Sequence, residues 1–306
     1  MEKRELVIIG GGPAGLSAGI YASRAAMNTI LLERGVPGGL VVSTESIENY
    51  PGFANGVGGP ELMIQMENQA RRFGLEILST HVESIKPQDK EFIVQTDDGQ
   101  IAAGAVIIAT GVQPQFLNVK GEAEYTGRGV SYCATCDGAF FRGKRVAVVG
   151  GGDAAVEEAI FLTKFAEKVF IIHRRGELRA TKVVQQRAFN NSKIDFVWHS
   201  VVDEIHGTDT VEAVLARDVR NGEKTSLNVN GVFIYVGNRP NSGLVKDIIR
   251  LNEKGYIITD ENMFTSYPGL LAAGDVRQKL LRQVVTAVAD GAIAAVAAEK
   301  YLEEKK

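Results

Sequence analysis

The sequence predicts an α/β fold in which one kind of strand-turn-helix unit occurs twice. Two glycine-rich turns, Gly10–Gly15 and Gly150–Ala155, each follow a short apolar strand and each open a helical stretch. The strands, Leu6–Ile9 and Val146–Val149, are apolar on both faces, as parallel strands covered by helices on both sides must be. We therefore expect two Rossmann-like domains with doubly covered parallel sheets.

Each turn places the first N–H groups of a helix where they can hold a pyrophosphate, so the turns predict two dinucleotide sites. A single turn of this kind is weak evidence, because any tight strand-to-helix connection favours glycine. Two of them in matching context are stronger evidence. The residues expected at the nucleotides are Gly10, Gly12, Pro13, Ala14 and Gly15 in the first turn and Gly150, Gly152, Asp153 and Ala154 in the second.

The residue that ends the second strand of each unit indicates which nucleotide binds. Glu33 and His173 lie at the same offset from the first glycine of their turns. A carboxylate accepts hydrogen bonds from a ribose 2′-hydroxyl and repels a 2′-phosphate, so the first unit is expected to bind an unphosphorylated adenosine. His173 is followed by Arg174 and Arg175, whose guanidinium groups suit a 2′-phosphate, so the second unit is expected to bind NADPH. The alternative is that these are ordinary solvated charges after strands.

Size and composition limit the function classes. The 306 residues suffice for about two domains, and the net charge of −3, with lysines and arginines spread along the chain, argues against nucleic-acid binding. The first residues lack the apolar core of a signal peptide, and no apolar run approaches the roughly 18 residues of a membrane span. The chain has only two cysteines, Cys133 and Cys136, and they form a Cys-x-x-Cys motif. We therefore expect a redox-active pair in a cytoplasmic protein.

The order of elements along the chain predicts an insertion. Helices are expected at 60–73, 182–189 and 283–302, with strand-like segments at 105–111, 232–237 and 270–273. The last strand and helix are too short to form a domain and need a sheet to pack on, so we expect them to return to the first unit. The predicted domains are therefore 1–114 with 241–306, and an inserted 115–240 joined by two crossings near Pro114 and Pro240.

Taken together, these motifs resemble the low-molecular-weight thioredoxin reductases over nearly the whole chain. The most specific match is Cys133-Ala134-Thr135-Cys136-Asp137-Gly138, just before the second turn. The other matches are Gly10–Gly15, Ala109-Thr110-Gly111, His173-Arg174-Arg175 with Arg179, and Gly274-Asp275 with Arg282-Gln283. The resemblance implies FAD in the first domain, NADPH in the inserted domain, a homodimer, and thioredoxin as the substrate.

The resemblance also implies further cofactor residues. Those implied for FAD, besides the first turn and Glu33, are Gly39, Leu40, Asn49, Thr110, Gly111, Gly274, Asp275, Arg282 and Gln283, and those implied for NADPH are His173, Arg174, Arg175 and Arg179. Asp275 has an alternative role as the cap of the final helix. The sequence departs from many relatives at Gly38-Gly39-Leu40, where they have Gly-Gly-Gln-Leu, and at Leu178, where phenylalanine is common.

The expected chemistry centres on the two cysteines. A flavin can accept a hydride and pass its two electrons to a disulfide, and the resulting dithiol can reduce a partner by thiolate attack through a mixed disulfide. The resemblance suggests that Cys136 faces the flavin and Cys133 lies farther out. Asp137 is expected to act as a general acid/base, with a simple Asp-Gly turn as the alternative. The alternative that the two cysteines form half of a zinc site is disfavoured. Tetrahedral zinc needs about four ligands, and no second Cys-x-x-Cys is present.

Two other functions fit the same residues. One keeps the chemistry but serves another disulfide partner, such as a glutaredoxin-like or peroxiredoxin-reducing protein. The other is a redox or nucleotide sensor without turnover, against which Cys133, Cys136, Asp137 and the arginine pair argue. Because one dithiol cannot lie against a buried flavin and reach a protein disulfide in a single arrangement, we also expect the inserted domain to rotate about its two crossings.

Overall fold

The computed structural model describes residues 1–44 and 46–305, and this part of the chain divides into two compact units. Unit 1 contains residues 1–113 and 239–306, and unit 2 contains residues 114–238. The crossings run through two short strands, β7 (Val112–Pro114) and β16 (Asn238–Pro240), which pair with each other. The crossings expected near Pro114 and Pro240 are thus parts of paired strands.

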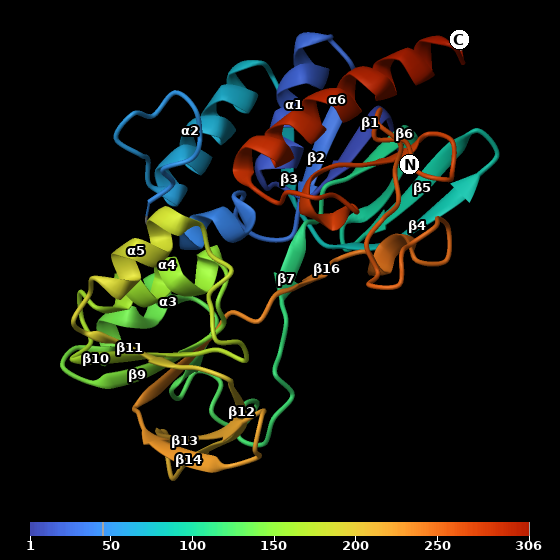
Figure 1. The fold of residues 1–306 in the computed structure, drawn as a ribbon. Helices are drawn as coiled ribbons and strands as arrows, with labels where there is room; N and C mark the ends of the chain where they lie inside the picture. The colour runs from blue at the N-terminus through green and yellow to red at the C-terminus, as the bar shows by residue number, and fades with distance from the viewer. Residues whose placement is uncertain (45, 306) are drawn as a thin grey trace. The chain divides into compact units, whose positions relative to one another are not determined.

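Unit 1 is built on a seven-stranded sheet (Figure 1). Its strands are β1 (Glu2–Ile9), β2 (Thr29–Glu33), β3 (Glu76–Ser79), β4 (Val82–Gln88), β5 (Glu91–Thr96), β6 (Gly99–Ile108) and β17 (Leu270–Ala272). The strand order is β3-β2-β1-β6-β5-β4, and β17 pairs with β6 outside this order. The strands β3, β2, β1, β6 and β17 pair in parallel. The strand β5 pairs antiparallel with both β4 and β6. The late strand β17 therefore completes the sheet of the first unit.

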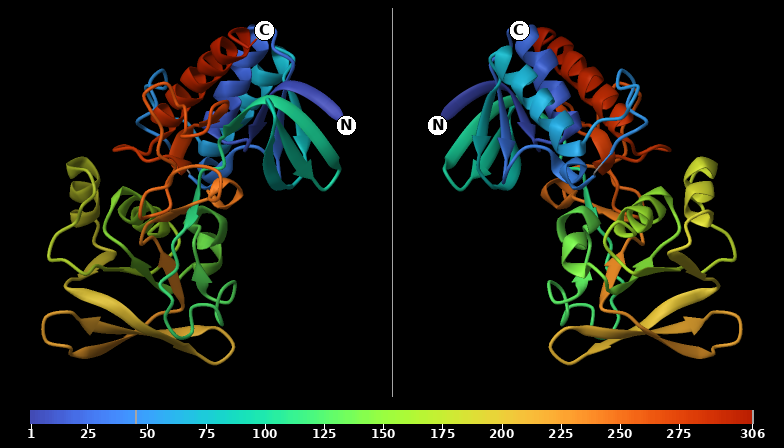
Figure 2. Two further views of the ribbon diagram at one scale, coloured as in Figure 1. Left: turned by 90° about the vertical axis from the view of Figure 1, so that its right-hand side faces the viewer. Right: turned by 90° about the vertical axis from the view of Figure 1, so that its left-hand side faces the viewer.

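The first strand shows why both faces must be apolar. Leu6 and Ile8 pack with α1 (Pro13–Arg24), α2 (Gly59–Arg72) and α6 (Val284–Glu303), whereas Val7 and Ile9 pack on the opposite face. The strand begins at Glu2, four residues before the expected start, because its exposed first half still pairs with β6. Both chain termini lie in this unit (Figure 2).

Unit 2 has a five-stranded parallel sheet in the order β11-β10-β9-β15-β8. The strands are β8 (Val130–Ser131), β9 (Arg145–Val149), β10 (Lys168–Ile172), β11 (Ile194–Val197) and β15 (Gly231–Ile234). The helices α3 (Ala134–Asp137), α4 (Asp153–Leu162) and α5 (Lys182–Phe189) cover one face. An antiparallel layer of β12 (Ser200–Gly207), β13 (Val211–Asp218) and β14 (Lys224–Asn228) covers the other (Figure 2).

Four 3-10 helices complete the described elements: η1 (Gly39–Ser43), η2 (Gly138–Phe141), η3 (Gly243–Val245) and η4 (Gly274–Val276). The α/β class with parallel sheets is confirmed for both units. In each unit the glycine-rich turn joins the end of a central parallel strand to a helix N-terminus, which is the edge of such a sheet at which ligands bind.

Candidate functional site

The first turn is built for a close approach to its ligand. Gly10 has a φ of 110°, and a Cβ at Gly15 would overlap the carbonyl oxygen of Gly10, so neither position tolerates a side chain. Gly12 caps α1 and Pro13 begins it; a Cβ at Gly12 would meet no atom within 4 Å. The N-terminus of α1 therefore opens onto free space, which fits a pyrophosphate.

Glu33 is fixed against this turn. Its carboxylate accepts the Gly11 N–H at 2.6 Å and the Gly35 N–H at 3.1 Å. Glu33 also lines a cleft of about 900 Å³ in unit 1, together with Gly10 and Thr110. A carboxylate held at a helix entrance beside a cleft fits a ribose hydroxyl better than it fits a freely solvated charge.

The same cleft contains residues that the sequence analysis did not single out. Thr80 and His81 follow β3, and Arg239, Lys246 and Lys254 line the cleft from the second part of unit 1. The Thr80 hydroxyl oxygen is buried and has no hydrogen-bond partner among the described residues. The available signal was positional, because Thr80 and His81 follow the next parallel strand beside β2 and so lie at the same sheet edge.

The other residues expected at FAD lie around this turn and at the start of α6. Thr110 donates its hydroxyl to the Asn241 carbonyl at 2.8 Å, and Gly111 follows it with a φ of 61°. Asn49 donates to the Gln283 side chain at 3.1 Å. In η1, Gly39 has a φ of 60° and comes close to Gly12, and Leu40 is exposed.

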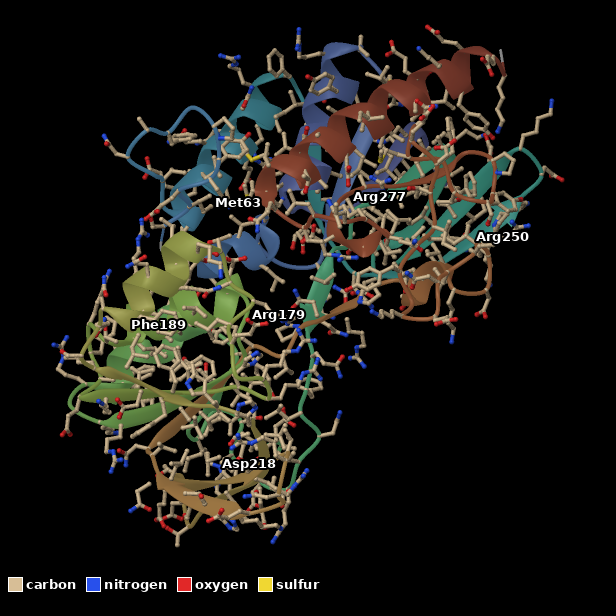
Figure 3. The ribbon with its side chains drawn as sticks, viewed as in Figure 1. Met63, Arg179, Phe189, Asp218, Arg250 and Arg277 are labelled. Atoms are coloured by element: carbon tan, nitrogen blue, oxygen red, sulfur yellow. A yellow bond between two sulfur atoms is a disulfide. The ribbon has the colours of Figure 1, made fainter. Side chains whose placement is uncertain are left out.

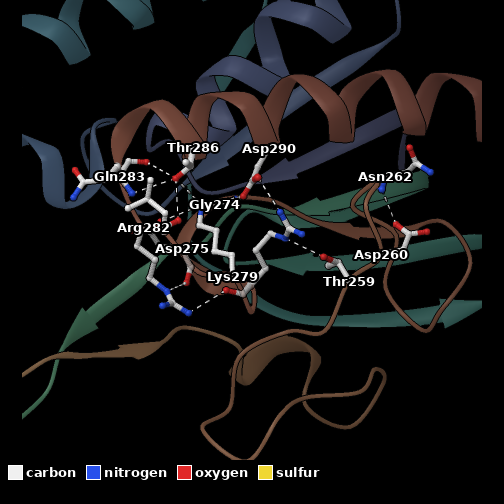
Figure 4. Close-up of polar contacts among 12 residues, drawn as sticks. Thr259, Asp260, Asn262, Gly274, Asp275, Lys279, Arg282, Gln283, Thr286 and Asp290 are labelled. Atoms are coloured by element: carbon white, nitrogen blue, oxygen red, sulfur yellow. Dashed lines mark hydrogen bonds and ion pairs between the residues drawn. The ribbon is translucent and has the colours of Figure 1, made fainter. Parts of the chain in front are cut away.

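Asp275 lies in a buried cluster of charges between η4 and α6 (Figure 4). Asp290 of α6 accepts the Gly274 N–H at 3.0 Å, Lys279 Nζ at 3.0 Å and Arg277 Nη1 at 2.8 Å. Burial raises the pKa of Asp275, and the charge of Lys279 opposes that rise. Asp275 Oδ1 lies 3.4 Å from Lys279 Nζ as an ion pair but has no well-aligned hydrogen bond in the described structure, which fits a hydroxyl donor from a ligand.

The alternative role of Asp275 as a helix cap is wrong. The residue that caps α6 is Gln283, which forms a reciprocal capping box with Thr286. Asp275 lies too far away to cap the helix, because seven residues separate it from Gln283. Arg282, just before the cap, holds its guanidinium 4.1 Å from the centre of the Tyr256 ring and is within 3.5 Å of the Asp275 carbonyl. The loop between η4 and α6 therefore brings Gly274, Asp275, Arg282 and Gln283 to one helix start.

The second turn repeats the geometry of the first. Gly150 has a φ of 150°, and Gly152 caps α4 with no atom within 4 Å of the place where its Cβ would be. Asp153 is tied down locally, since its carboxylate accepts the Thr181 N–H at 2.7 Å. Ala154 is exposed at the first turn of the helix. The N-terminus of α4 is thus also open to a pyrophosphate.

The basic segment after β10 surrounds His173. This histidine is buried against Gly151, and its Nε2 has no hydrogen-bond partner among the described residues. Burial lowers its pKa, and the charges of Arg179, Arg174 and Arg175 lower it further. The three arginines are exposed, and within the described chain no carboxylate forms an ion pair with them. The Arg179 N–H donates to the Gly151 carbonyl at 2.6 Å, which ties this segment (Figure 3) to the turn.

Such a cluster of unpaired guanidinium groups beside an open helix N-terminus fits a 2′-phosphate. Leu178 is buried in the core of unit 2. It therefore packs under the basic segment and does not reach the surface that the arginines form.

The cysteines form a disulfide at the start of α3. Cys133 caps the helix and its Sγ accepts the Cys136 N–H at 3.2 Å. The Ser131 hydroxyl accepts the Cys133 N–H at 3.0 Å and lies 2.7 Å from Asp137 Oδ2, to which it can donate. Cys136 is exposed and Cys133 is half-buried. Ser131 is a residue that sequence reasoning missed, because a serine two positions before the motif carries no pattern of its own.

Tyr132, directly before Cys133, belongs to a buried contact with Glu122. The Tyr132 hydroxyl donates to Glu122 at 2.9 Å, and Glu122 also accepts the N–H groups of Leu117 and Asn118. Burial raises the pKa of Tyr132, and the hydrogen bond to Glu122 raises it further. This contact anchors the strand that leads into the disulfide.

Among the described residues, no group of three or more His, Cys, Asp or Glu side chains could hold a metal ion. No helix of the described chain is long and apolar enough to cross a membrane.

Comparisons with known proteins extend over almost the entire sequence. The family described as pyridine nucleotide-disulphide oxidoreductase matches residues 4–291. The chain is 49% identical to the thioredoxin reductase of Peptoclostridium litorale over 306 residues, covering 98% of this chain and 97% of that one. It is 47% identical to the Bacillus subtilis thioredoxin reductase, covering 98% and 95%. The crystal structure of Lactococcus lactis thioredoxin reductase aligns with a TM-score of 0.97 at 47% identity, covering 98% of this chain and 99% of that one.

Proposed function

The chain belongs to the pyridine nucleotide-disulphide oxidoreductase family, and from this premise we propose that it is a thioredoxin-disulfide reductase that uses NADPH, FAD and the Cys133/Cys136 dithiol to reduce oxidised thioredoxin. The observation that carries the proposal is the Cys133–Cys136 disulfide, which shares a unit with the second nucleotide turn. In that arrangement one unit holds both the dithiol and the site for the nucleotide whose electrons reach the dithiol through the flavin.

We assign FAD to unit 1 and NADPH to unit 2. The open N-terminus of α1, Glu33 and the Asp275 oxygen that lacks a hydrogen-bond donor would hold FAD, and the open N-terminus of α4 and the arginines around His173 would hold NADPH. When bound, the flavin would supply a group that accepts one hydride, and so two electrons, and that reduces a disulfide. The residues of the chain bind and orient the two nucleotides and manage the protons of the dithiol.

The dithiol reduces its partner in two exchanges. One cysteine thiolate attacks a sulfur of the thioredoxin disulfide, forming a mixed disulfide and releasing one partner thiolate. The second cysteine then attacks the enzyme sulfur of the mixed disulfide, which re-forms Cys133–Cys136 and releases the other partner thiolate. Two electrons pass to the partner, and its two thiolates take up the two protons that the dithiol has lost.

Asp137 is the group we assign to those protons. It lies one residue after Cys136, and the Ser131 hydroxyl holds one of its oxygens. A carboxyl group in that position can take the proton of a thiol as it becomes a nucleophile and return it to a leaving thiolate.

We further propose that the protein is a cytoplasmic homodimer. A groove of about 460 Å³ on unit 1 is lined by apolar and aromatic side chains of α1 and α6, among them Tyr21, Ile293, Val296 and Tyr301. Ile293 and Val296 are exposed, and a second copy of the chain would bury them. Sedimentation analysis tests this: a monomer at micromolar concentration would contradict the dimer.

We also propose that unit 2 rotates about the two crossings, so that the dithiol and the nicotinamide meet the flavin alternately. A disulfide engineered between the units should stop turnover and release it on reduction. Turnover that is unaffected by a formed staple would contradict the rotation.

The proposed function is tested by NADPH consumption with and without oxidised thioredoxin, with NADH run in parallel. We expect thioredoxin-dependent consumption that favours NADPH. In the Arg174→Ala/Arg175→Ala variant, KM for NADPH should rise about tenfold or more while KM for NADH stays unchanged. Arg220→Ala, which removes an exposed arginine of the β13–β14 hairpin, is the matched control.

The alternatives have their own outcomes. If NADPH reduces the flavin but thioredoxin is not reduced, a glutaredoxin-like or peroxiredoxin-reducing protein should be tried as the substrate. Turnover with such a protein would show that it, and not thioredoxin, is the disulfide partner. No turnover with any disulfide partner would favour a redox sensor.

A further inference from the structure

Tyr235 connects the second nucleotide turn to the disulfide. It directly follows β15, and its side chain reaches the start of α3, where its hydroxyl oxygen accepts the Ala134 N–H at 2.8 Å. Ala134 is fully buried, so no water can replace this acceptor. Sequence reasoning missed this tyrosine, because it lies 101 positions beyond Ala134.

The accepted N–H group is the first of a helix that has only one turn. Cys133 caps α3, Ala134 is its first residue, and the Cys136 N–H points at Cys133 Sγ from the same turn. The orientation of that N–H group depends on how the first turn is held. Fixing the Ala134 N–H therefore also fixes the donor that faces the Cys133 sulfur.

The tyrosine itself is held firmly. Its N–H donates to the Val149 carbonyl at 2.8 Å, and its carbonyl oxygen lies against Gly150, where any Cβ would overlap it. The ring therefore projects toward α3 from backbone that is locked to the end of β9.

The titratable groups around this contact are Asp137 on α3 itself and Glu158 on α4, which packs beside α3. Burial raises the pKa of Tyr235, and the charges of Glu158 and Asp137 raise it further. The hydroxyl therefore stays neutral throughout the range in which thiols titrate.

We propose that Tyr235 is a positioning residue for the dithiol, which holds the first turn of α3 so that the Cys136 N–H stabilises the thiolate of reduced Cys133. The inference rests on the proposed redox role of the dithiol and adds a residue to it. A hydrogen bond to the charged form of a thiol favours that form. Loss of the anchor should therefore raise the pKa of the Cys133 thiol.

The test is alkylation of the reduced holoenzyme by iodoacetamide across a pH series, with each cysteine quantified by mass spectrometry. In Tyr235→Phe, the midpoint of the Cys133 profile should move to higher pH, and its alkylation rate near neutral pH should fall at least threefold. Tyr125→Phe is the matched control, because Tyr125 is a buried tyrosine of the same unit whose hydroxyl donates to the Gly207 carbonyl. A wild-type Cys133 profile in Tyr235→Phe would overturn the proposal.

A second measurement uses the unaltered protein. Its Cys136 N–H donates to Cys133 Sγ at 3.2 Å. A thiolate that accepts such a hydrogen bond forms more readily than that of a free cysteine, whose pKa is about 8.5. The midpoint of the Cys133 profile in the unaltered protein should therefore lie below about pH 8.5.

A Cys133 midpoint at or above about pH 8.5 in the unaltered protein would overturn the proposal even where Tyr235→Phe fails to fold. The alkylation assay needs neither NADPH nor thioredoxin. Failure of thioredoxin reduction with a shifted Cys133 profile would therefore reject the proposed function alone.

Discussion

At the scale of single residues, the Ser131 hydroxyl organises the surroundings of the disulfide. It accepts the N–H of Cys133 and lies within hydrogen-bond distance of Asp137, so it links the backbone of the half-buried Cys133 to the carboxylate that follows the exposed Cys136. A general acid must lie close to the atom that it serves, and a short tether of this kind limits where Asp137 can move. The arrangement favours acid/base chemistry over a simple Asp-Gly turn.

Asp137→Asn should slow thioredoxin-dependent turnover by about 10- to 100-fold, because the amide cannot exchange a proton with the dithiol. The flavin absorbance spectrum should stay that of the unaltered protein. Stopped-flow measurement of NADPH-driven reduction of thioredoxin checks both. Ser131→Ala is the comparison that keeps the carboxyl group, and it should lose less activity. Equal turnover in Asp137→Asn and the unaltered protein would refute the role.

His173 makes a prediction about stability and pH. Its pKa is lowered from the ordinary value of 6.5, first by burial and then by the charges of Arg179, Arg174 and Arg175. Below about pH 6.5 the unfolded chain therefore binds a proton that the folded chain does not, so the free energy of unfolding falls as the pH decreases through this window. Once the pH lies below the lowered folded pKa, this residue causes no further loss.

The measurement is urea unfolding at about pH 7.5 and about pH 5.5. His173→Gln should lose less free energy of unfolding between the two than the unaltered protein does. His206→Gln, at an exposed position, should behave as the unaltered protein. An identical loss in His173→Gln would show that this histidine does not contribute.

At the scale of elements, α1 and α6 cross at glycine. A Cβ at Gly291 of α6 would overlap the backbone oxygen of Ala14, which belongs to the first nucleotide turn. Glycine inside a helix ordinarily costs about 1 kcal/mol relative to alanine, so close packing is what requires it here. The last helix of the chain thus presses directly on the turn that we assign to FAD.

Gly291→Ala should lower the free energy of unfolding by about 1–3 kcal/mol, since the added methyl group overpacks the crossing. It should also weaken FAD retention, because Ala14 must move. Thermal unfolding and the FAD content after gel filtration measure the two effects. Ala289→Ser, at an exposed position of the same helix, is the control and should change neither. A more stable Gly291→Ala protein would contradict the close crossing.

At the scale of the whole molecule, each unit has its own cores and its own nucleotide turn, so the units are expected to respond to different ligands. The sequence has a single tryptophan, Trp198, which stacks on Phe196 at 4.9 Å between ring centroids. Both residues belong to unit 2. Tryptophan fluorescence therefore reports the unfolding of unit 2 alone.

A ligand present at about 100 times its Kd stabilises the unit that binds it by about 2.7 kcal/mol. NADP⁺ added to the FAD-free protein should raise the midpoint of the tryptophan transition, and NAD⁺ at the same concentration should raise it less. FAD should leave that midpoint unchanged and should raise the midpoint of the unfolding transition of unit 1, followed by circular dichroism. A tryptophan transition that responds to FAD and not to NADP⁺ would reverse the assignment of the nucleotides.

The sequence predicted those features that depend on neighbours along the chain. The glycine turns, the offset of Glu33 and His173, and the Cys-x-x-Cys motif all lie within short segments whose geometry follows from local rules. The contacts that support them were beyond such reasoning. Asp290 reaches Gly274 from 16 positions away, and Tyr235 reaches Ala134 from 101, so both depend on how strands and helices pack. The cap of α6 was missed because the loop before it is irregular and Gln283 is a less common cap than aspartate.

Unit 1 consists of two chain segments separated by unit 2, and this affects how the protein folds during its synthesis on the ribosome. Its sheet needs β17 and its first helix needs α6, and both are synthesised only after all of unit 2. Unit 2 is continuous and can collapse as soon as it emerges. During synthesis, unit 2 can therefore fold while the first segment of unit 1 is still incomplete. In that interval the apolar faces of α1 and β6 stay exposed, because α6 and β17 have not yet been made. We expect chaperones to bind the nascent chain in this interval.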